Sequence, residues 1–153
     1  MNRFFYWLWR VLPLPKSIRT FSMWVINPKF VVGTAILILN EHGEILLFKH
    51  TYRKKYPWGL PGGYMMRGEN PDQTIQRELM EESSLQVRDL QLKETFHSSE
   101  MSRLEVIFTG KLVNWDAFTP SIEVSEARFF PVNQLPSLMR GHHAIIKRLI
   151  LHK

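Results

Sequence analysis

Apolar residues in this chain gather into short runs separated by turn-forming segments, and these runs predict its strands. Residues 30–39, FVVGTAILIL, are rich in β-branched side chains and are typical of a buried strand. The segment NEHGE predicts a turn, so ILLFKH at 45–50 is expected to return as the second strand of a hairpin. Further strands are expected near residues 86–94, 103–112 and 127–131.

Helices are predicted where capping residues coincide with a helical apolar period. The segment 70–73, NPDQ, combines an N-cap asparagine, a proline for the first helical position and a capping-box glutamine. Ile75 and Leu79 then lie at i and i+4 on a buried stripe. A basic helix over about residues 141–152 closes the chain. Because helices and strands are mixed without a regular βαβ repeat, we expect the α+β class with a mixed sheet.

Residues 1–29 differ in character from the rest of the chain. The opening MNRFFYWLWRVLPLP is aromatic and basic, and a second, weak helical stretch covers residues 15–26. A helix within residues 1–15 could pack on its own domain, pair two subunits of a homodimer, or lie at a membrane interface. Arg10 interrupts the apolar stretch and no A-x-A site comes after it, which argues against a signal peptide. We therefore expect a helical extension, residues 1–29, and one domain, residues 30–153.

Composition limits the classes of protein that this chain can belong to. Its 153 residues suffice for one domain with a substantial core. No apolar run approaches the ~18 residues of a membrane span. The absence of cysteine excludes disulfides, thiolate zinc sites and a cysteine nucleophile, and it fits a cytoplasmic location.

Charge is unevenly distributed along the chain. The net charge is +6, yet residues 1–40 hold five basic side chains and no acid, whereas residues 41–126 hold all fourteen acids and ten basic side chains. Residues 127–153 add five basic groups. Basic surfaces attract nucleic acid, anionic lipid or phosphorylated small molecules, and charge alone does not choose among them.

The segment RELMEESSL at 77–85 contains an unfavourable arrangement of charge. In a helix, Glu78, Glu81 and Glu82 stand at i, i+3 and i+4 on one face. Like charges at this spacing cost about 0.2–0.5 kcal/mol per pair, and acids at a helix C-terminus oppose the macrodipole. The alternatives are a functional cluster and a solvated acidic face that Arg77 partly neutralises.

The surrounding residues favour the functional interpretation. From Gly63 the chain reads GYMMRGENPDQTIQRELMEESSL, which resembles the Nudix box: Gly, five residues, Glu, seven residues, Arg-Glu-apolar-x-Glu-Glu-x-Gly-apolar. The matching positions are Gly63, Glu69, Arg77, Glu78, Leu79, Glu81, Glu82 and Leu85. Ser84 stands where the family has glycine. The flanking segments WGLPGG and EARFFPVNQLP also look like those of the family, so the resemblance spans roughly residues 30–136.

The resemblance implies an α/β/α sandwich around a mixed sheet and hydrolysis of a nucleoside diphosphate linked to another moiety, with Mg²⁺ or Mn²⁺. Such hard cations take oxygen ligands, neutralise an anionic pyrophosphate and acidify bound water. Three carboxylates on one helix face provide such oxygens. Their mutual repulsion is relieved when a divalent cation binds.

Carried over position by position, the resemblance implies roles for individual residues. Metal ligands are expected at Glu82, Glu81 and Glu78, completed by the carbonyl of Gly62. Catalytic roles are expected for Glu78, as general base, and Glu81. Outside the box, Glu123 is either a further catalytic residue or an ordinary exposed acid, with Glu126 in reserve. Gly63, Glu69 and Arg77 are expected to be structural, the last two as an ion pair that ties the loop to the helix.

The substrate is less well defined by sequence. Arg53, Lys54 and Lys55 precede the glycine loop, where they either bind substrate phosphates or form a solvated loop. The proline that ADP-ribose-cleaving members carry beyond the box is replaced by Glu100 and Met101. We expect a nucleotide-derived small molecule rather than nucleic acid. The alternatives are a nucleotide-sensing or scaffold domain with weak catalysis and an RNA 5′-end pyrophosphohydrolase.

Ser84 raises a separate structural question. A glycine just beyond a helix usually supplies a positive φ, which costs another residue on the order of 1 kcal/mol. We expect either that Ser84 adopts this strained conformation or that the helix ends differently. No carboxylate is lost in either case.

Overall fold

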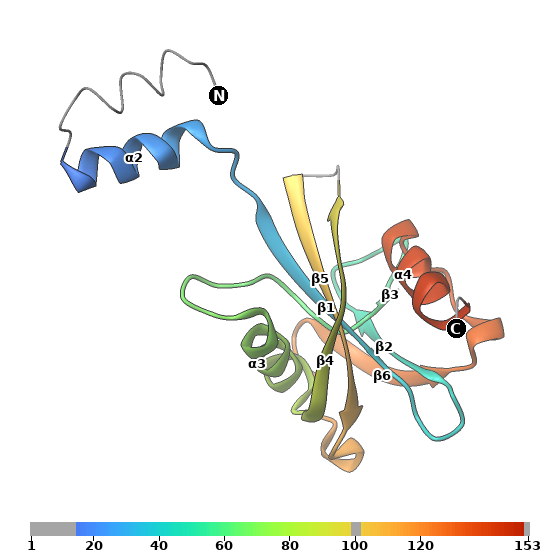
Figure 1. Cartoon of the computed structure of the whole chain (residues 1–153). Coiled ribbons are helices and arrows are strands. Elements are labelled where there is room, and N and C mark those ends of the chain that lie inside the picture. The colour runs from blue at the N-terminus through green and yellow to red at the C-terminus, as the bar shows by residue number, and fades with distance from the viewer. Residues whose placement is uncertain (1–14, 99–101, 152–153) are drawn as a thin grey trace. The chain divides into compact units, whose positions relative to one another are not determined.

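A computed structural model describes residues 15–98 and 102–151. The chain divides into two units, Met1–Phe30 and Val31–Lys153, which are treated separately. In the first unit, helix α2 (Lys16–Ile26) confirms the second predicted helical stretch (Figure 1). The predictions for residues 1–14, including contact with a membrane or a second subunit, lie outside the described residues. Within the described ranges, no helix has the length and apolar character needed to cross a membrane.

Within its described residues, 31–98 and 102–151, the second unit contains six strands and two helices. The strands are β1 (Val31–Ile38), β2 (Ile45–His50), β3 (Trp58–Gly59), β4 (Val87–Ser98), β5 (Arg103–Leu112) and β6 (Val124–Phe130). The helices are α3 (Pro71–Ser83) and α4 (Arg140–Leu151), and two 3₁₀ turns lie at Trp115–Ala117 and Val132–Gln134. The predicted elements are confirmed, although β6 begins three residues earlier than expected. The two-residue strand β3 has no counterpart among the predictions.

The strands form two three-stranded sheets, and their pairing corrects one prediction. One sheet has the order β1-β5-β4, with β1 parallel and β4 antiparallel to β5, whereas the order β3-β2-β6 is antiparallel. The expected β1–β2 hairpin is wrong, because a single bridge between Leu39 and Ile45 joins these strands. Both strands are buried on both faces. β1 pairs with the distant β5, whereas β2 pairs with β3, the next strand along the chain, and with the distant β6.

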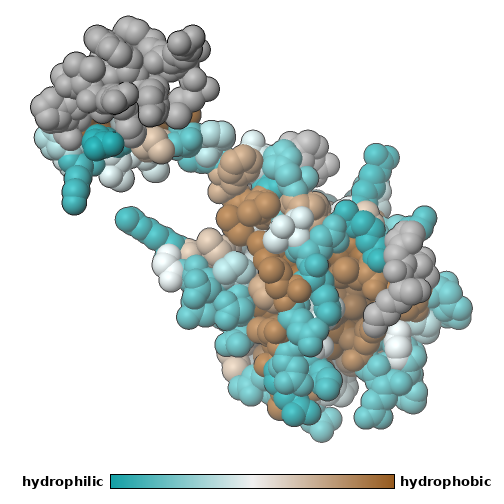
Figure 2. Space-filling view, in the orientation of Figure 1, coloured by the Kyte–Doolittle hydropathy of each residue, from teal (hydrophilic) through white to brown (hydrophobic). Residues whose placement is uncertain are grey.

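Helices cover the strands from two sides. Ile36 of β1 shares a core cluster with Leu79 of α3. The next residue, Leu37, points to the opposite face and shares a second cluster with Ile146 of α4. Figure 1 shows α3 and α4 on opposite sides of the strands, and Figure 2 shows apolar residues concentrated between hydrophilic ones. The α+β class and the α/β/α arrangement are therefore confirmed.

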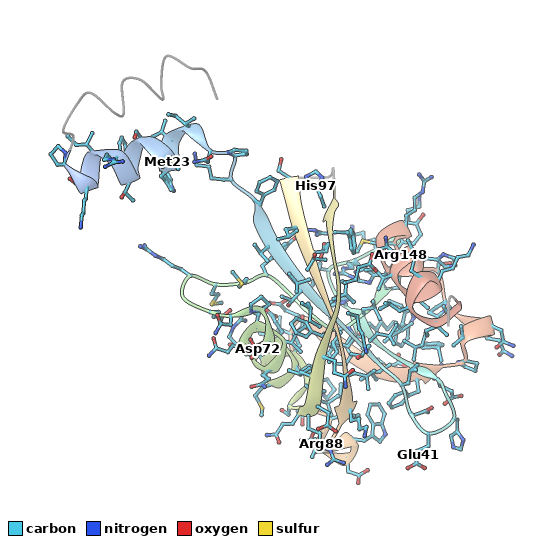
Figure 3. The ribbon with its side chains drawn as sticks, viewed as in Figure 1. Met23, Glu41, Asp72, Arg88, His97 and Arg148 are labelled. Carbon is cyan, nitrogen blue, oxygen red and sulfur yellow. The ribbon has the colours of Figure 1, made fainter. Side chains whose placement is uncertain are left out.

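Helix α3 begins where its capping signals place it. Pro71 is its first residue, and the Asn70 N–H donates to Oε1 of Gln73 at 2.8 Å, which is one half of the predicted capping box. Asp72 lies in the first turn (Figure 3), where its negative charge favours the positive end of the helix dipole.

The end of α3 settles the question that Ser84 raised. Ser84 has φ 58° and ψ 13°, the left-handed conformation that glycine adopts readily. Asn114 stabilises the chain around it, since its Nδ2 donates to the Ser84 carbonyl at 3.2 Å and its Oδ1 accepts from the Gln86 N–H at 2.7 Å. Ser84 therefore adopts the first of the two expected conformations, at the cost of strain.

Candidate functional site

A cleft of about 540 Å³ lies beside α3 and gathers residues from distant parts of the sequence. The predicted site residues that line it are Arg53, Gly62, Gly63, Arg77, Glu78, Glu81, Glu82 and Glu123. Lys54 and Lys55 are exposed and do not line it. Glu126, the reserve candidate, also lies outside and contacts Lys49 at 3.4 Å. Arg53 and Glu123 therefore line the cleft, whereas Lys54, Lys55 and Glu126 do not.

Arg77 is the centre of a network of carboxylates at the edge of the cleft. Its Nε donates to Glu69 at 2.6 Å and its Nη2 donates to the Tyr64 carbonyl at 3.0 Å, which ties the loop to the helix. The hydrogen bond from Arg77 is the main cause that lowers the pKa of Glu69 to about 2. The structure shows the expected ion pair. Arg77 Nη1 in addition donates to Glu78 at 2.8 Å and to Glu81 at 2.9 Å.

Glu82 is the most deeply buried of the three glutamates on α3. Its side chain lies in the cleft and the residue is 6% exposed. Its Oε2 is buried and has no hydrogen-bond partner within residues 15–98 and 102–151. Burial, followed by the charges of Glu78 and Glu123, raises the pKa of Glu82 to about 8. Burial likewise raises the pKa of Glu78, although Arg77 opposes the shift. The charge of Glu123 acts on both groups, so this exposed acid lies close enough to belong to the cleft.

These residues suit a divalent cation, although they do not form a closed ligand cage. Across residues 15–98 and 102–151, no three His, Cys, Asp or Glu side chains form a metal-binding group. Arg77 holds the carboxylates of Glu78 and Glu81, and the unpartnered Oε2 of Glu82 remains an available donor. The donors are hard oxygens, which Mg²⁺ and Mn²⁺ prefer.

The glycine loop makes room for the acids. A Cβ on Gly63 would collide with the carboxylate of Glu78, and a Cβ on Gly62 would collide with the backbone of Thr34. Gly62 also has φ 143°, a conformation that other residues rarely adopt. The loop therefore needs glycine at Gly63 for space, and at Gly62 for both space and conformation.

Several residues that line the cleft were missed from the sequence. Glu105 forms an ion pair with Arg103, whose Nη1 donates to the Tyr64 hydroxyl at 3.1 Å. Glu105 interrupts the apolar run of β5, and an acid in a buried strand needs a polar or charged partner. This pattern could have identified Glu105 as a candidate from the sequence. His142 of α4 also lines the cleft. No local pattern distinguishes it from a solvated histidine of a basic helix.

Comparisons with known proteins agree with this geometry. A family profile described as NUDIX domain matches residues 29–151. An ADP-ribose pyrophosphatase from Methanocaldococcus jannaschii is 29% identical over 118 residues, which are 72% of this chain and 68% of that protein. An RNA pyrophosphohydrolase from Blochmanniella pennsylvanica is 30% identical over 84 residues, 55% of this chain and 50% of that protein. The structure of a NUDIX hydrolase from Nitrosomonas europaea matches with a TM-score of 0.69 and 26% identity, over 83% of this chain and 73% of that one.

Proposed function

The chain belongs to the NUDIX family of pyrophosphate hydrolases, and from this premise we propose how its cleft acts. The proposed substrate is a nucleoside diphosphate linked to another moiety. One observation carries the proposal: Glu82 has a buried carboxylate oxygen without a hydrogen-bond partner among the described residues, inside a cleft that four further acids line. A carboxylate in such surroundings is unfavourable until a cation compensates it.

Three glutamates of α3 are the proposed cation ligands. Glu82 contributes its free oxygen, and Glu78 and Glu81 contribute theirs when they exchange Arg77 Nη1 for the cation. Gly62 lines the cleft beside them, and its carbonyl is the proposed fourth protein ligand. A bound Mg²⁺ or Mn²⁺ neutralises substrate phosphates and lowers the pKa of coordinated water.

Glu78 is the proposed general base. Burial raises its pKa toward the working pH, and a base is most effective when its pKa lies near that pH. Glu123 is the second candidate, because its charge reaches both Glu78 and Glu82 while its side chain stays exposed. Arg77 and Glu69 position the loop and the helix and take no direct part in proton transfer.

The test is turnover of a panel of substrates with Mg²⁺ and with Mn²⁺: ADP-ribose, other nucleoside diphosphate derivatives, nucleoside triphosphates and RNA with a 5′-triphosphate. Glu82→Gln keeps the size of the side chain and removes its charge, so we expect it to lose most activity. Glu126→Gln is the matched control, because Glu126 lies outside the cleft. Full activity of Glu82→Gln with saturating metal would contradict the proposed ligand set.

RNA 5′-end hydrolysis is the second candidate. It is favoured by the similarity to an RNA pyrophosphohydrolase and by the basic residues on both sides of the acidic segment. RNA binding by these residues would weaken steeply as salt increases, because counterions are released when phosphates are neutralised. A nucleotide-sensing domain is less favoured, since Ser84 leaves every carboxylate of the cleft in place.

A further inference from the structure

Arg53, in the loop between β2 and β3, has a buried guanidinium nitrogen that no other group satisfies. It lines the cleft, and its Nη1 is buried with no hydrogen-bond partner. Nη2 lies 3.4 Å from the Tyr52 hydroxyl, and the guanidinium lies 5.4 Å from the Tyr52 ring centroid. Among the described residues, no carboxylate forms an ion pair with it. The charge of Arg53 opposes the raised pKa of Glu82, but no ion pair joins these two groups among the described residues, so the half-buried guanidinium can still bind an anion.

Two histidines near Arg53 are neutral. Burial is the main cause, and the charge of Arg53 the second, that lowers the pKa of His50 to about 3 and of His142 to about 4. The Leu60 N–H donates to Nδ1 of His142 at 2.9 Å, which leaves the proton of His142 on Nε2 as a hydrogen-bond donor. His50 is 2% exposed, and neither of its ring nitrogens has a hydrogen-bond partner among the described residues. His142 lines the cleft together with Arg53, whereas His50 does not.

Gly59 of β3 creates the space that these side chains share. A Cβ at this position would lie 2.6 Å from Arg53 Nη1 and 2.9 Å from His142 Nδ1. Both side chains therefore approach the same point of the backbone. Glycine is required at position 59 because a Cβ would collide with Arg53 and His142. Without a side chain at this position, Arg53 has space to reach the cleft.

We infer that Arg53 and His142 form an anion subsite that binds a phosphoryl group independently of the divalent cation. The inference rests on the proposed function, because a substrate or product phosphate is the expected occupant. Arg53 supplies the charge and fixed donors of a guanidinium, which match phosphate oxygens. Lys54 and Lys55 lie outside the cleft and have no part in the subsite. The cleft thus separates two tasks, cation binding at α3 and phosphate binding at Arg53.

Inorganic phosphate is the probe, and thermal unfolding of the full chain in EDTA is the readout. A ligand that binds the folded state raises Tm, by roughly 5–10 °C at about a hundred times its Kd for a chain of this size. We expect this rise in the wild type, relative to chloride at equal ionic strength. We expect it to be lost in Arg53→Gln and in Gly59→Ala. Lys54→Gln, in the same loop, is the matched control and is expected to retain it.

Each result of this experiment decides the inference. Arg53→Gln removes a guanidinium that forms no ion pair among the described residues, so the variant is expected to fold, and its own Tm without phosphate verifies this. An equal phosphate shift in Arg53→Gln and wild type, or no shift in the wild type, would overturn the subsite. Glu82→Gln separates the two proposals: it is expected to lose turnover and to keep the phosphate shift. A wild type that turns over substrate but shows no phosphate shift rejects only the subsite, whereas a Glu82→Gln variant with normal turnover rejects only the ligand set.

Discussion

Arg77 donates a hydrogen bond of 2.9 Å from Nη1 to Glu81, one turn further along α3. The same nitrogen contacts Glu78, so a single guanidinium neutralises two of the three proposed cation ligands. The electrostatic cost of the acidic face is therefore reduced before any metal binds. A cation has to compete with Arg77 for these two carboxylates, whereas it does not have to do so for Glu82.

Arg77→Lys tests this network. Lysine keeps the charge but cannot reach Glu69, the Tyr64 carbonyl and the α3 acids together, because it lacks the planar fork of arginine. We expect the free energy of unfolding to fall by about 1 kcal/mol and turnover to decrease as the loop loses its brace. Arg88→Lys, on β4 (Figure 3), is the control for the substitution itself. Equal stability of the two variants would show that the network contributes nothing measurable.

Ser84→Gly tests the strain at the end of α3. Glycine adopts the left-handed conformation of residue 84 without the Cβ penalty, so we expect the free energy of unfolding to rise by about 0.5–1 kcal/mol. Activity is expected to persist, since no carboxylate changes. Denaturant titration measures the gain in the free energy of unfolding. Ser84→Ala keeps a Cβ and is the control in which no gain is expected. A Ser84→Gly variant that is less stable than wild type would indicate that the Ser84 side chain stabilises the fold by more than its strained backbone destabilises it.

The raised pKa of Glu82 predicts how the free energy of unfolding depends on pH in EDTA. The folded state holds the Glu82 proton up to a pKa of about 8, whereas the unfolded state releases it near 4.5. Between these values the folded state binds more protons, so the Glu82 contribution to the free energy of unfolding falls as pH rises. Glu82→Gln cannot titrate at this position, and its stability relative to wild type is expected to increase between about pH 5 and pH 8.

The measurement compares the free energies of unfolding of the two proteins at each pH. This is necessary because the lowered pKa values of His50 and His142 make stability rise with pH, which is opposite to the effect of Glu82. These groups are present in both proteins, so the difference isolates Glu82. A difference that stays constant from pH 5 to pH 8 would show that Glu82 titrates normally in the fold. Added Mg²⁺ is expected to stabilise wild type and to reduce the difference.

Gly63→Ala tests whether the loop gives Glu78 its position. The new Cβ would collide with the Glu78 carboxylate, so the side chain has to move. Misplacement of a reacting group by about 1 Å costs about a hundredfold in rate, and we expect kcat to fall on that scale while the protein remains folded. Gly141→Ala, where a Cβ meets no atom within 4 Å, is the matched control with expected normal turnover. Normal kcat in Gly63→Ala would remove Glu78 from the role of base.

The sequence alone determined the elements and the acidic box. Local signals sufficed for these features: β-branched runs for β1 and β2, capping residues for α3, and glutamates spaced at i, i+3 and i+4 for the acidic face of α3. The ion pair of Glu69 with Arg77 was predicted from the motif as well. Such features depend on neighbours within one or two turns of the chain, so they are visible before folding.

Only the tertiary structure decided which strands pair and which charged residues reach the cleft. The turn after β1 predicted a hairpin, yet β1 pairs in parallel with β5, and β2 is the central strand of the other sheet. Both strands are buried on both faces, and the residues that cover them come from distant parts of the sequence. Arg53 and Lys54 are adjacent in sequence, but only Arg53 lines the cleft, where Gly59 leaves space for it. Burial and the lack of a hydrogen-bond partner arise from long-range packing, and these properties distinguish Arg53 and Glu82 from ordinary surface charges.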